Sequence, residues 1–437
     1  MKQITTYGVR IHAASLKPVQ DMVSIYRQAV SFLIHVCDEQ WNAISVFSAL
    51  VRKQYVEGLV HHTKKRPFVE YEEFDRQFYK MPSYIRRAAI AEAIGAVESY
   101  RSRLKAWNEN PVGKAPGVPQ AGYTYPVLYA ENMLVQTGEH SARIKVWLRN
   151  TWDWMDVTFR KSDADYIARH CNDRHKLCPT VVRKGRNWEL MFPFEEEVTL
   201  RTVDINDQVV LAVDLGINNA CACSVMRSDG TIVGRRIFRM PEQEDCLYHL
   251  LNKVKKASKQ GNQHVPALWS SINNTNRRIA EETARFITRT AEEFHADVIV
   301  FEMLDISGKT KGRSKRQRLH LWKSRDVQSM VTCKAHRMGI RVSHVNAWNT
   351  SRLAFDGSGK VERSKKNYSI CTFQTGKIYN CDLNASYNIG ARYFIREITK
   401  TLPVTTGLGI SAKVPECTRR STCTLSTLLN LNAALAA

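Results

Sequence analysis

The sequence lacks any apolar run of the roughly 18 residues that a membrane-spanning helix requires, so we expect no membrane protein. Its start, MKQITTYGVRIHAAS, has no hydrophobic region and no small-residue cleavage site, and a secretory signal is therefore not expected. The eleven cysteines are scattered, without the spacing framework of a secreted disulfide-rich domain. These absences favour a cytoplasmic protein with reduced thiols.

Acidic residues are few compared with basic ones. The chain has 64 Lys and Arg against 42 Asp and Glu, which gives a net charge of +22 and a pI near 9.6. Such a surplus indicates a polyanionic partner, either nucleic acid or an anionic membrane surface. Hydrophobic residues make up 43% of the chain, which excludes a wholly disordered protein, and 437 residues allow two to four domains.

Hydrophobic periodicity indicates how the chain is organised. Residues 4–12 are predicted to form a strand, an amphipathic helix follows from Met22, and a second helix spans about 83–107. Three Pro and three Gly in residues 111–122 predict a linker. Residues 187–194 (NWELMFPF) alternate as a half-buried strand does, and a small β-rich domain is expected around it. The Thr- and Ser-rich tail after about residue 400 carries no clear prediction.

Three carboxylates stand in unusual places. Asp214 lies inside 209–215 (VVLAVDL), an apolar run typical of a strand covered on both faces, and a turn at 228–230 then predicts a hairpin. Glu302 interrupts a second apolar run, 297–304, after a helix near 271–295. Asp382 stands where another helix is predicted to begin, at its N-cap.

Each carboxylate alone is more often an internal hydrogen-bond acceptor or a simple helix cap. Together, two strand-borne acids and one at a helix start match the needs of a site for two Mg²⁺ ions. Such ions lie roughly 4 Å apart and stabilise the attacking and leaving oxygens of a phosphodiester. The basic surplus is consistent with a polyanionic substrate for such a site.

The stretches VVLAVDLGINN, VIVFEML and CDLNASYNIG resemble the first, second and third RuvC motifs of the TnpB family of transposon-encoded nucleases. The type V CRISPR effectors descend from that family. Residues 322–351, which include KAHRMGIRVSHVNAWNTS, resemble the segment that leads from the second motif to the family's zinc-binding insert. The resemblance is strong over about 206–395 and weak elsewhere.

The resemblance implies an α/β fold class with additional α and β parts. An RNase H-like (RuvC) nuclease domain would span 206–437, with a zinc-finger-derived insert at about 349–380. A helical recognition domain would span 21–115, and a small β-barrel-like wedge domain would combine 1–20 with 116–205.

The family's function is carried over as an expectation. The protein would bind a transposon-derived guide RNA and cleave double-stranded DNA beside a short flanking motif, as guide pairing supplies sequence recognition. Asp214, Glu302 and Asp382 would be the catalytic acids and would bind two Mg²⁺ ions. The protein would act as a monomeric ribonucleoprotein in the prokaryotic cytoplasm, near the nucleoid.

The insert departs from the family pattern. Family members carry two CxxC pairs there, a four-thiolate zinc spacing. In this chain the corresponding positions are Ala354, Gly357, Cys371 and Gln374. We therefore expect no zinc, and an insert whose shape depends on packing or on nucleic-acid contacts.

Residues 309–325 contain eight Lys or Arg and no acid. A charge run is usually a solvated face, but directly after the strand of Glu302 it favours nucleic-acid contact. The predicted contacts in this run are Lys309, Lys311, Arg313, Lys315, Arg316, Arg318 and Trp322. Arg352, beside the Thr-Ser step, is a further candidate as a phosphate clamp.

Other functions stay open at this stage. A compact type V CRISPR effector and a guided DNA-binding protein without nuclease activity share the motifs. The D-L-G-x-N stretch after a strand also opens the phosphate-binding hairpin of actin-like ATPases, but no Asp-Gly-Gly loop follows it here. A DDE-type transposase is disfavoured by the third motif.

Overall fold

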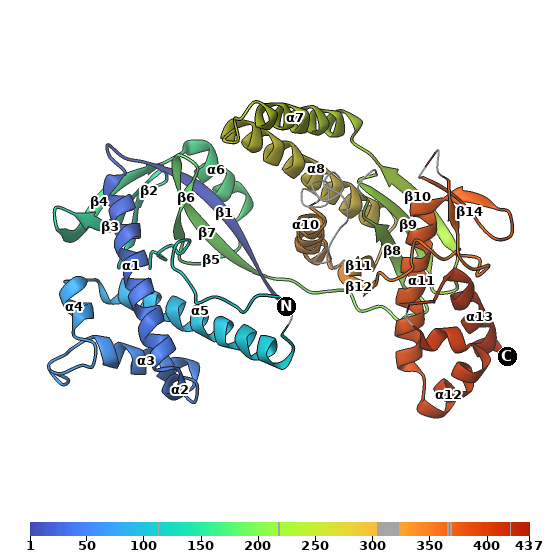
Figure 1. Cartoon of the computed structure of the whole chain (residues 1–437), viewed down its shortest axis with the longest axis horizontal. Coiled ribbons are helices and arrows are strands. Elements are labelled where there is room, and N and C mark those ends of the chain that lie inside the picture. The colour runs from blue at the N-terminus through green and yellow to red at the C-terminus, as the bar shows by residue number, and fades with distance from the viewer. Residues whose placement is uncertain (112, 217–218, 304–322, 365–366, 368, 420) are drawn as a thin grey trace. The chain divides into compact units, whose positions relative to one another are not determined.

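The computed structural model describes residues 1–111, 113–216, 219–303, 323–364, 367, 369–419 and 421–437. Among these residues the chain divides into two compact units, each considered by itself below (Figure 1). The N-terminal unit is Lys2–Glu196, and the C-terminal unit is Glu197–Ala437 together with Met1. None of the described helices is both long and apolar enough to cross a membrane.

The N-terminal unit combines several helices with a seven-stranded sheet. The described strands are β1 (Lys2–His12), β2 (Leu134–Gly138), β3 (Ser141–Leu148), β4 (Thr151–Phe159), β5 (His175–Lys176), β6 (Thr180–Lys184) and β7 (Asn187–Glu197). They follow the order β2-β3-β4-β1-β7-β5, with β6 also paired to β7. The helices are α1 (Lys17–Glu39), α2 (Trp41–Ile44), α3 (Ala49–Val60), α4 (Glu73–Gln77), α5 (Ser83–Glu109) and α6 (Lys161–His170).

The core of this unit follows the periodicity of its sequence. In β7, Trp188, Leu190, Phe192 and Phe194 are all buried, which confirms the predicted alternation. In α1, apolar residues at helical spacing form a buried stripe, and α1 packs against α5. The strands predicted at 4–12 and 187–194 and the two long helices are therefore confirmed. The functional division into wedge and recognition domains stays a prediction.

The C-terminal unit is built on a mixed five-stranded sheet. Its strands are β8 (Val209–Asp214), β9 (Cys221–Arg227), β10 (Ile232–Phe238), β11 (Val298–Met303) and β12 (Arg341–Asn346). They follow the order β10-β9-β8-β11-β12, in which β8, β11 and β12 are parallel and β9 and β10 are antiparallel to their neighbours. The predicted turn at 228–230 joins β9 to β10 and is confirmed.

Helices cover both faces of this sheet (Figure 1). They are α7 (Pro241–Lys259), α8 (Pro266–Glu293), α10 (Ser324–Arg337), α11 (Cys381–Thr401), α12 (Val404–Lys413), the short 3₁₀ helix η1 (Pro415–Thr418) and α13 (Leu425–Ala436). Leu211, Val213 and Phe301 share one buried cluster with α8 and α10. Ala212 and Val300, the alternate residues, share another with α11 and α13. This alternation explains why β8 and β11 read as continuous apolar runs.

The tail beyond residue 400, which the sequence left unassigned, packs against α11. Its last helix, α13, buries Leu425, Leu428 and Leu431 in the cluster that α11 shares with the sheet. Thr424 and Thr427 form a reciprocal capping box at the start of α13. The tail therefore forms part of the hydrophobic core of the C-terminal unit.

The insert between β12 and α11 has a small core of its own. Its strands β13 (Glu362–Arg363), β14 (Ile370–Thr372) and β15 (Ile378–Asn380) form an antiparallel sheet. Ala354, Cys371, Phe373 and Cys381 are buried together, and the Phe355 ring packs edge-on against Phe373 and Tyr379. Apolar packing is thus present where the family's zinc pattern is incomplete.

Two glycines provide a matched test of packing. A Cβ at Gly390 of α11 would lie 3.1 Å from the Met226 side chain and 3.3 Å from Ala212 Cβ, whereas one at Gly95 of α5 would meet nothing. We expect Gly390→Val to destabilise the C-terminal unit by about 1–3 kcal/mol through overpacking. Gly95→Ala should stabilise the N-terminal unit by about 0.5–1 kcal/mol. Hydrogen exchange of peptides from each unit measures both effects. Unchanged exchange in peptides of the C-terminal unit of Gly390→Val would contradict this packing.

The insert core predicts independence from zinc. We expect Phe373→Ala to cost about 3 kcal/mol, because a large buried ring is lost, and to raise hydrogen exchange throughout 349–380. Treatment of the wild-type protein with a zinc chelator should leave exchange in the same peptides unchanged. Chelator-induced exchange, or zinc at one equivalent by elemental analysis, would show that the insert binds metal after all.

Candidate active site

Asp214 and Glu302 lie opposite each other on neighbouring parallel strands. The register pairs Val213 of β8 with Phe301 of β11, and each acid is the next residue of its strand. Side chains alternate between the two faces of a sheet, so both acids share the face of Ala212 and Val300, which α11 covers. The strand pairing alone therefore places two carboxylates side by side under one helix.

Asp382 comes to the same place from α11. The helix begins at Cys381, and its N-cap is Asn380, whose side chain accepts hydrogen bonds from the backbone N–H groups of Asp382 and Leu383. The prediction that Asp382 is the N-cap is therefore wrong. Because Asn380 caps the helix, the Asp382 carboxylate is released from that role and accepts a hydrogen bond from the Asn219 side chain.

The three acids influence one another electrostatically. Burial raises the pKa of Asp214 well above its usual value, and the negative charges of Glu302 and Asp382 raise it further. Burial also raises the pKa of Glu302, which is only 9% exposed, although a hydrogen bond from the Thr350 hydroxyl opposes this shift. Arg363 and Arg392 lower the pKa values of Asp214 and Glu302 respectively, but burial outweighs them and both pKa values stay raised.

The donor set fits magnesium. Three carboxylates supply hard oxygen ligands, and a divalent cation would relieve their repulsion. Within the described residues, no group of three His, Cys, Asp or Glu side chains is already arranged to hold an ion. Glu302 and Asp382 are instead hydrogen-bonded to Thr350 and Asn219.

Sequence reasoning missed a row of polar side chains on α11 that we call the polar stripe. Its members are spaced four residues apart, on one face of the helix: Asn384, Asn388, Arg392 and Arg396. All four bind the 343–355 segment, which runs from β12 into the insert. The signal in the sequence was polar residues at regular spacing within an otherwise apolar helix.

The stripe binds mostly backbone atoms. The Asn384 side chain donates to the Leu353 carbonyl (2.9 Å) and accepts from Phe355 N–H (2.8 Å). Asn388 Nδ2 donates to the carbonyls of Thr350 and Leu353, both at 2.9 Å. These bonds fix the backbone of Thr350, whose hydroxyl binds Glu302.

The two arginines of the stripe hold neighbouring parts of the segment. Arg392, only 5% exposed, donates to the carbonyls of Asn346 (2.7 Å) and Trp348 (2.8 Å) and also binds two carbonyls of the C-terminal tail. Arg396 donates to the His344 carbonyl at 2.7 Å and to a β12 serine. The stripe thus joins sheet, insert and tail.

A second cation missed from the sequence is Arg363 of β13. Its guanidinium acts on Asp214 in the direction opposite to the other acids, lowering the pKa of that carboxyl. It is exposed and comes from the insert. A positive charge therefore stands beside the acids on the side from which the insert approaches.

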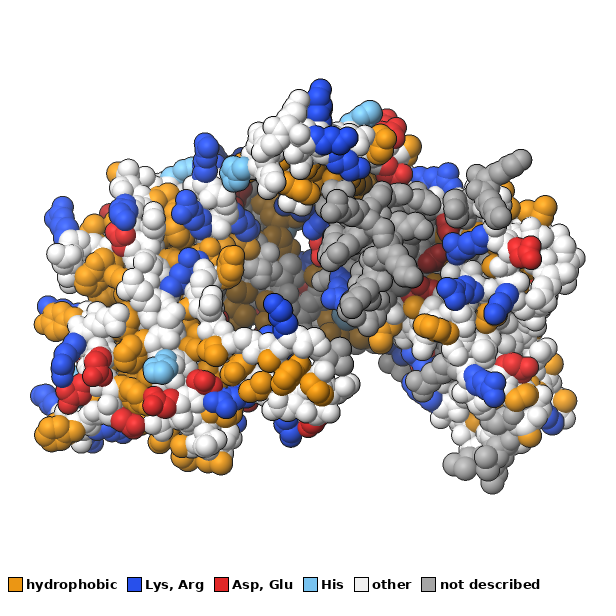
Figure 2. All heavy atoms as spheres, in the orientation of Figure 1, with side chains coloured by type: hydrophobic (Ala, Val, Ile, Leu, Met, Phe, Trp, Pro, Cys, Tyr) orange, Lys and Arg blue, Asp and Glu red, His pale blue; other side chains and the backbone are white. Residues whose placement is uncertain are grey.

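The predicted basic contacts at 309–318 and Trp322 lie outside the described residues. Arg352 is described, exposed, and lines a pocket of the C-terminal unit. On the face shown in Figure 2, Lys and Arg side chains are spread over both units. The positive surplus is therefore not confined to one segment.

Two family models match the chain. The model described as the Aq_aa04 family matches residues 5–148, in the N-terminal unit. The model described as the TNB domain of Cas12f1-like proteins matches residues 325–389, which contain Thr350, the insert and Asp382.

The chain is also similar to known proteins in sequence and in fold. The chain is 24% identical over 230 residues to the TnpB-like protein aq_aa05 of Aquifex aeolicus (strain VF5), covering 48% of this chain and 74% of that protein. In fold it is similar to the structure of a Cas12f1–sgRNA–target DNA complex, with a TM-score of 0.54 and 13% identity over 85% of this chain and 80% of that one. The mini-RNA-guided endonuclease CRISPR-Cas_phi3 also matches, with a TM-score of 0.46 and 11% identity over 89% of this chain and 92% of that one. These matches confirm the predicted resemblance to the TnpB family.

Proposed function

We propose that the protein is an RNA-guided DNA endonuclease and that its C-terminal unit is a RuvC-like nuclease of RNase H-like fold. The observation that carries this is the arrangement of Asp214, Glu302 and Asp382, which parallel strand register and one covering helix bring to the same face. Guide RNA and double-stranded target DNA are the proposed partners, in keeping with the positive charge of the chain.

In this proposal the three carboxylates bind Mg²⁺, and the neighbouring polar groups orient them. Two such ions would activate a water and stabilise the departing oxygen of a phosphodiester. Thr350 holds Glu302 by its hydroxyl, and Asn219 holds Asp382 by its amide. Arg363 would attract the phosphate toward the acids, since it is an exposed cation of the insert that lowers the pKa of Asp214.

The remaining parts of the chain take roles in binding. We propose that the helices of 21–115 and the β-rich parts 1–20 and 116–205 bind the guide RNA and read a short flanking motif in duplex DNA. The basic run 309–325 and Arg352 would hold the strand near the acids. A compact type V CRISPR effector has the same chemistry, and a guided binding protein without cleavage is the outcome that the first experiment below would reveal.

Removal of one carboxylate at a time tests the nuclease. We expect Asp214→Asn, Glu302→Gln and Asp382→Asn each to lower the rate of guided cleavage at least about 100-fold, because each is a direct ligand in the proposal. Guide RNA binding should be unchanged. In EDTA, the Asp214→Asn protein should unfold at the same temperature as the wild type or higher, since a carboxyl with a raised pKa costs stability once it is ionised.

Glu282→Gln serves as the matched control, since Glu282 is a carboxylate of α8 whose one ion pair among the described residues is with Arg285. It should cleave as the wild type does. Wild-type cleavage by Asp214→Asn would show that the acids are not the catalytic site. Guided binding without cleavage in the wild type would favour the binding protein.

Thr350 is proposed as a positioning residue. Thr350→Val removes the hydroxyl that binds Glu302, and we expect cleavage to fall by about 10-fold and the Mg²⁺ concentration for half-maximal rate to rise. Thr350→Ser should restore both. Thr283→Val removes a hydroxyl of α8 whose one hydrogen bond within the described part of the chain is to the Ile279 carbonyl, and it is the control for a general loss of stability. An unchanged Mg²⁺ requirement in Thr350→Val would contradict the positioning role.

A further inference from the structure

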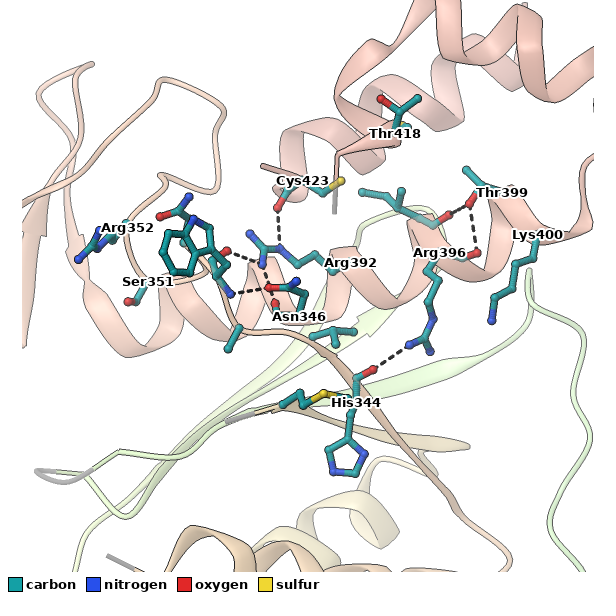
Figure 3. Close-up of a pocket in the computed structure, with 17 residues that line it drawn as sticks. His344, Asn346, Ser351, Arg352, Arg392, Arg396, Thr399, Lys400, Thr418 and Cys423 are labelled. Atoms are coloured by element: carbon teal, nitrogen blue, oxygen red, sulfur yellow. Dashed lines mark hydrogen bonds between the residues drawn. The ribbon is translucent and has the colours of Figure 1, made fainter. Parts of the chain in front are cut away.

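The C-terminal unit contains a pocket of about 1120 Å³, whose lining residues are drawn in Figure 3. Its walls come from the end of β12 and the loop that follows, from the C-terminal half of α11, and from Cys417, Thr418 and Cys423 of the tail. The volume lies at the upper end of the roughly 300–1,000 Å³ of ordinary small-molecule sites, so the pocket has room for one or more units of a polymer.

Chain connectivity ties the pocket to the acids. Met303, which lines it, directly follows Glu302. Asn349 and Ser351, which also line it, flank Thr350, the residue whose hydroxyl binds Glu302. The pocket is therefore lined by residues that adjoin both partners of the Glu302–Thr350 hydrogen bond.

The pocket is positively charged. Four basic side chains line it, and no Asp or Glu does so among the described residues: Arg352, Arg392, Arg396 and Lys400. Arg396 and Lys400 both form an ion pair with Glu397, which does not line the pocket. The Arg392 guanidinium donates its hydrogen bonds to backbone carbonyls. The Arg352 guanidinium has no hydrogen bond or ion pair to any described residue, and in Figure 3 it lies at one end of the group of lining residues.

An anchored aromatic side chain completes the pocket. Trp348 lines it and is 67% exposed, which is unusual for the largest apolar side chain. Its backbone is nevertheless fixed, because its N–H donates to Asn346 Oδ1 (2.8 Å) and its carbonyl accepts from Arg392 (2.8 Å). An exposed ring on a rigid backbone costs little entropy when it stacks on a base.

We propose that this pocket binds a single-stranded stretch of nucleic acid, with one base stacked on Trp348 and a phosphate held by Arg352. Stacking on the indole requires a base that is not already paired and stacked in a duplex, so the site selects single strands. The inference rests on the proposed function, since it names the part of the substrate that extends from the acids. Sequence-independent contacts suit a nuclease whose specificity comes from a guide.

The first test measures binding separately from cleavage. The probe is a 5′-fluorescein-labelled 12-residue oligothymidylate, added to the full-length protein purified with its RNA, in EDTA so that no cleavage occurs. Fluorescence anisotropy should show that Trp348→Ala binds about tenfold more weakly. Arg352→Gln should bind more weakly at low salt and lower the slope of log affinity against log salt by about one.

Two variants of α8 are matched controls: Trp269→Ala, which removes another exposed indole, and Arg285→Gln, which removes another exposed guanidinium. Both should bind as the wild type does. Equal losses in the controls, or unchanged affinity in Trp348→Ala and Arg352→Gln, would overturn the proposal. Competition by thymidine monophosphate as strong as by the oligomer would also overturn it, because a mononucleotide site would then be present.

Photocrosslinking locates the contact. An oligothymidylate carrying one 5-iododeoxyuridine should crosslink to the peptide that contains Trp348, and crosslinks found only elsewhere would contradict the proposal. The result can be separated from the proposed nuclease activity. If the pocket variants lose binding but the wild-type protein never cleaves DNA, only the proposed function is refuted. Acid-dependent cleavage with unaffected pocket variants would refute only this inference.

Discussion

The polar stripe of α11 is the interaction on which the rest of the C-terminal unit depends. Four side chains, Asn384, Asn388, Arg392 and Arg396, hold the 343–355 segment along the helix, one after another. Loss of a partner from such a buried donor costs about 1–3 kcal/mol. The same stripe fixes Thr350 against Glu302 and holds the Trp348 backbone, so it positions both the acids' surroundings and the adjoining pocket.

The acids themselves work against stability. Asp214 lies beneath α11, where burial and repulsion from Glu302 and from Asp382 of the helix itself raise its pKa. The apolar clusters on both faces of the sheet and the packing of α13 on α11 offset this cost. Apolar packing also stabilises the insert, where the Phe355 ring packs against the buried Phe373. A fold that tolerates three adjacent carboxylates is consistent with a site that acquires cations when it functions.

The sequence allowed the positions of Asp214 and Glu302 to be predicted as strand-borne, because a carboxylate inside an apolar run is a local signal. It did not identify the helix cap, because Asn380 and Asp382 are both suitable caps and only the three-dimensional structure separates them. The stripe was missed for another reason: its partners are backbone atoms about 30 to 50 residues away, which leave no mark of their own in the sequence. The tail likewise gave no signal, because its apolar residues become meaningful only once α11 offers them a surface.

The central claim is that an RNA directs this protein to DNA. The most direct measurement is to express the full chain together with the DNA that flanks its gene, to sequence the RNA that copurifies, and to challenge the complex with duplex DNA that matches it. The account predicts one dominant RNA with defined ends and a variable 3′ segment, which directs Mg²⁺-dependent cleavage of the matching duplex. Heterogeneous cellular RNA that directs no cleavage of any matching duplex would contradict the account.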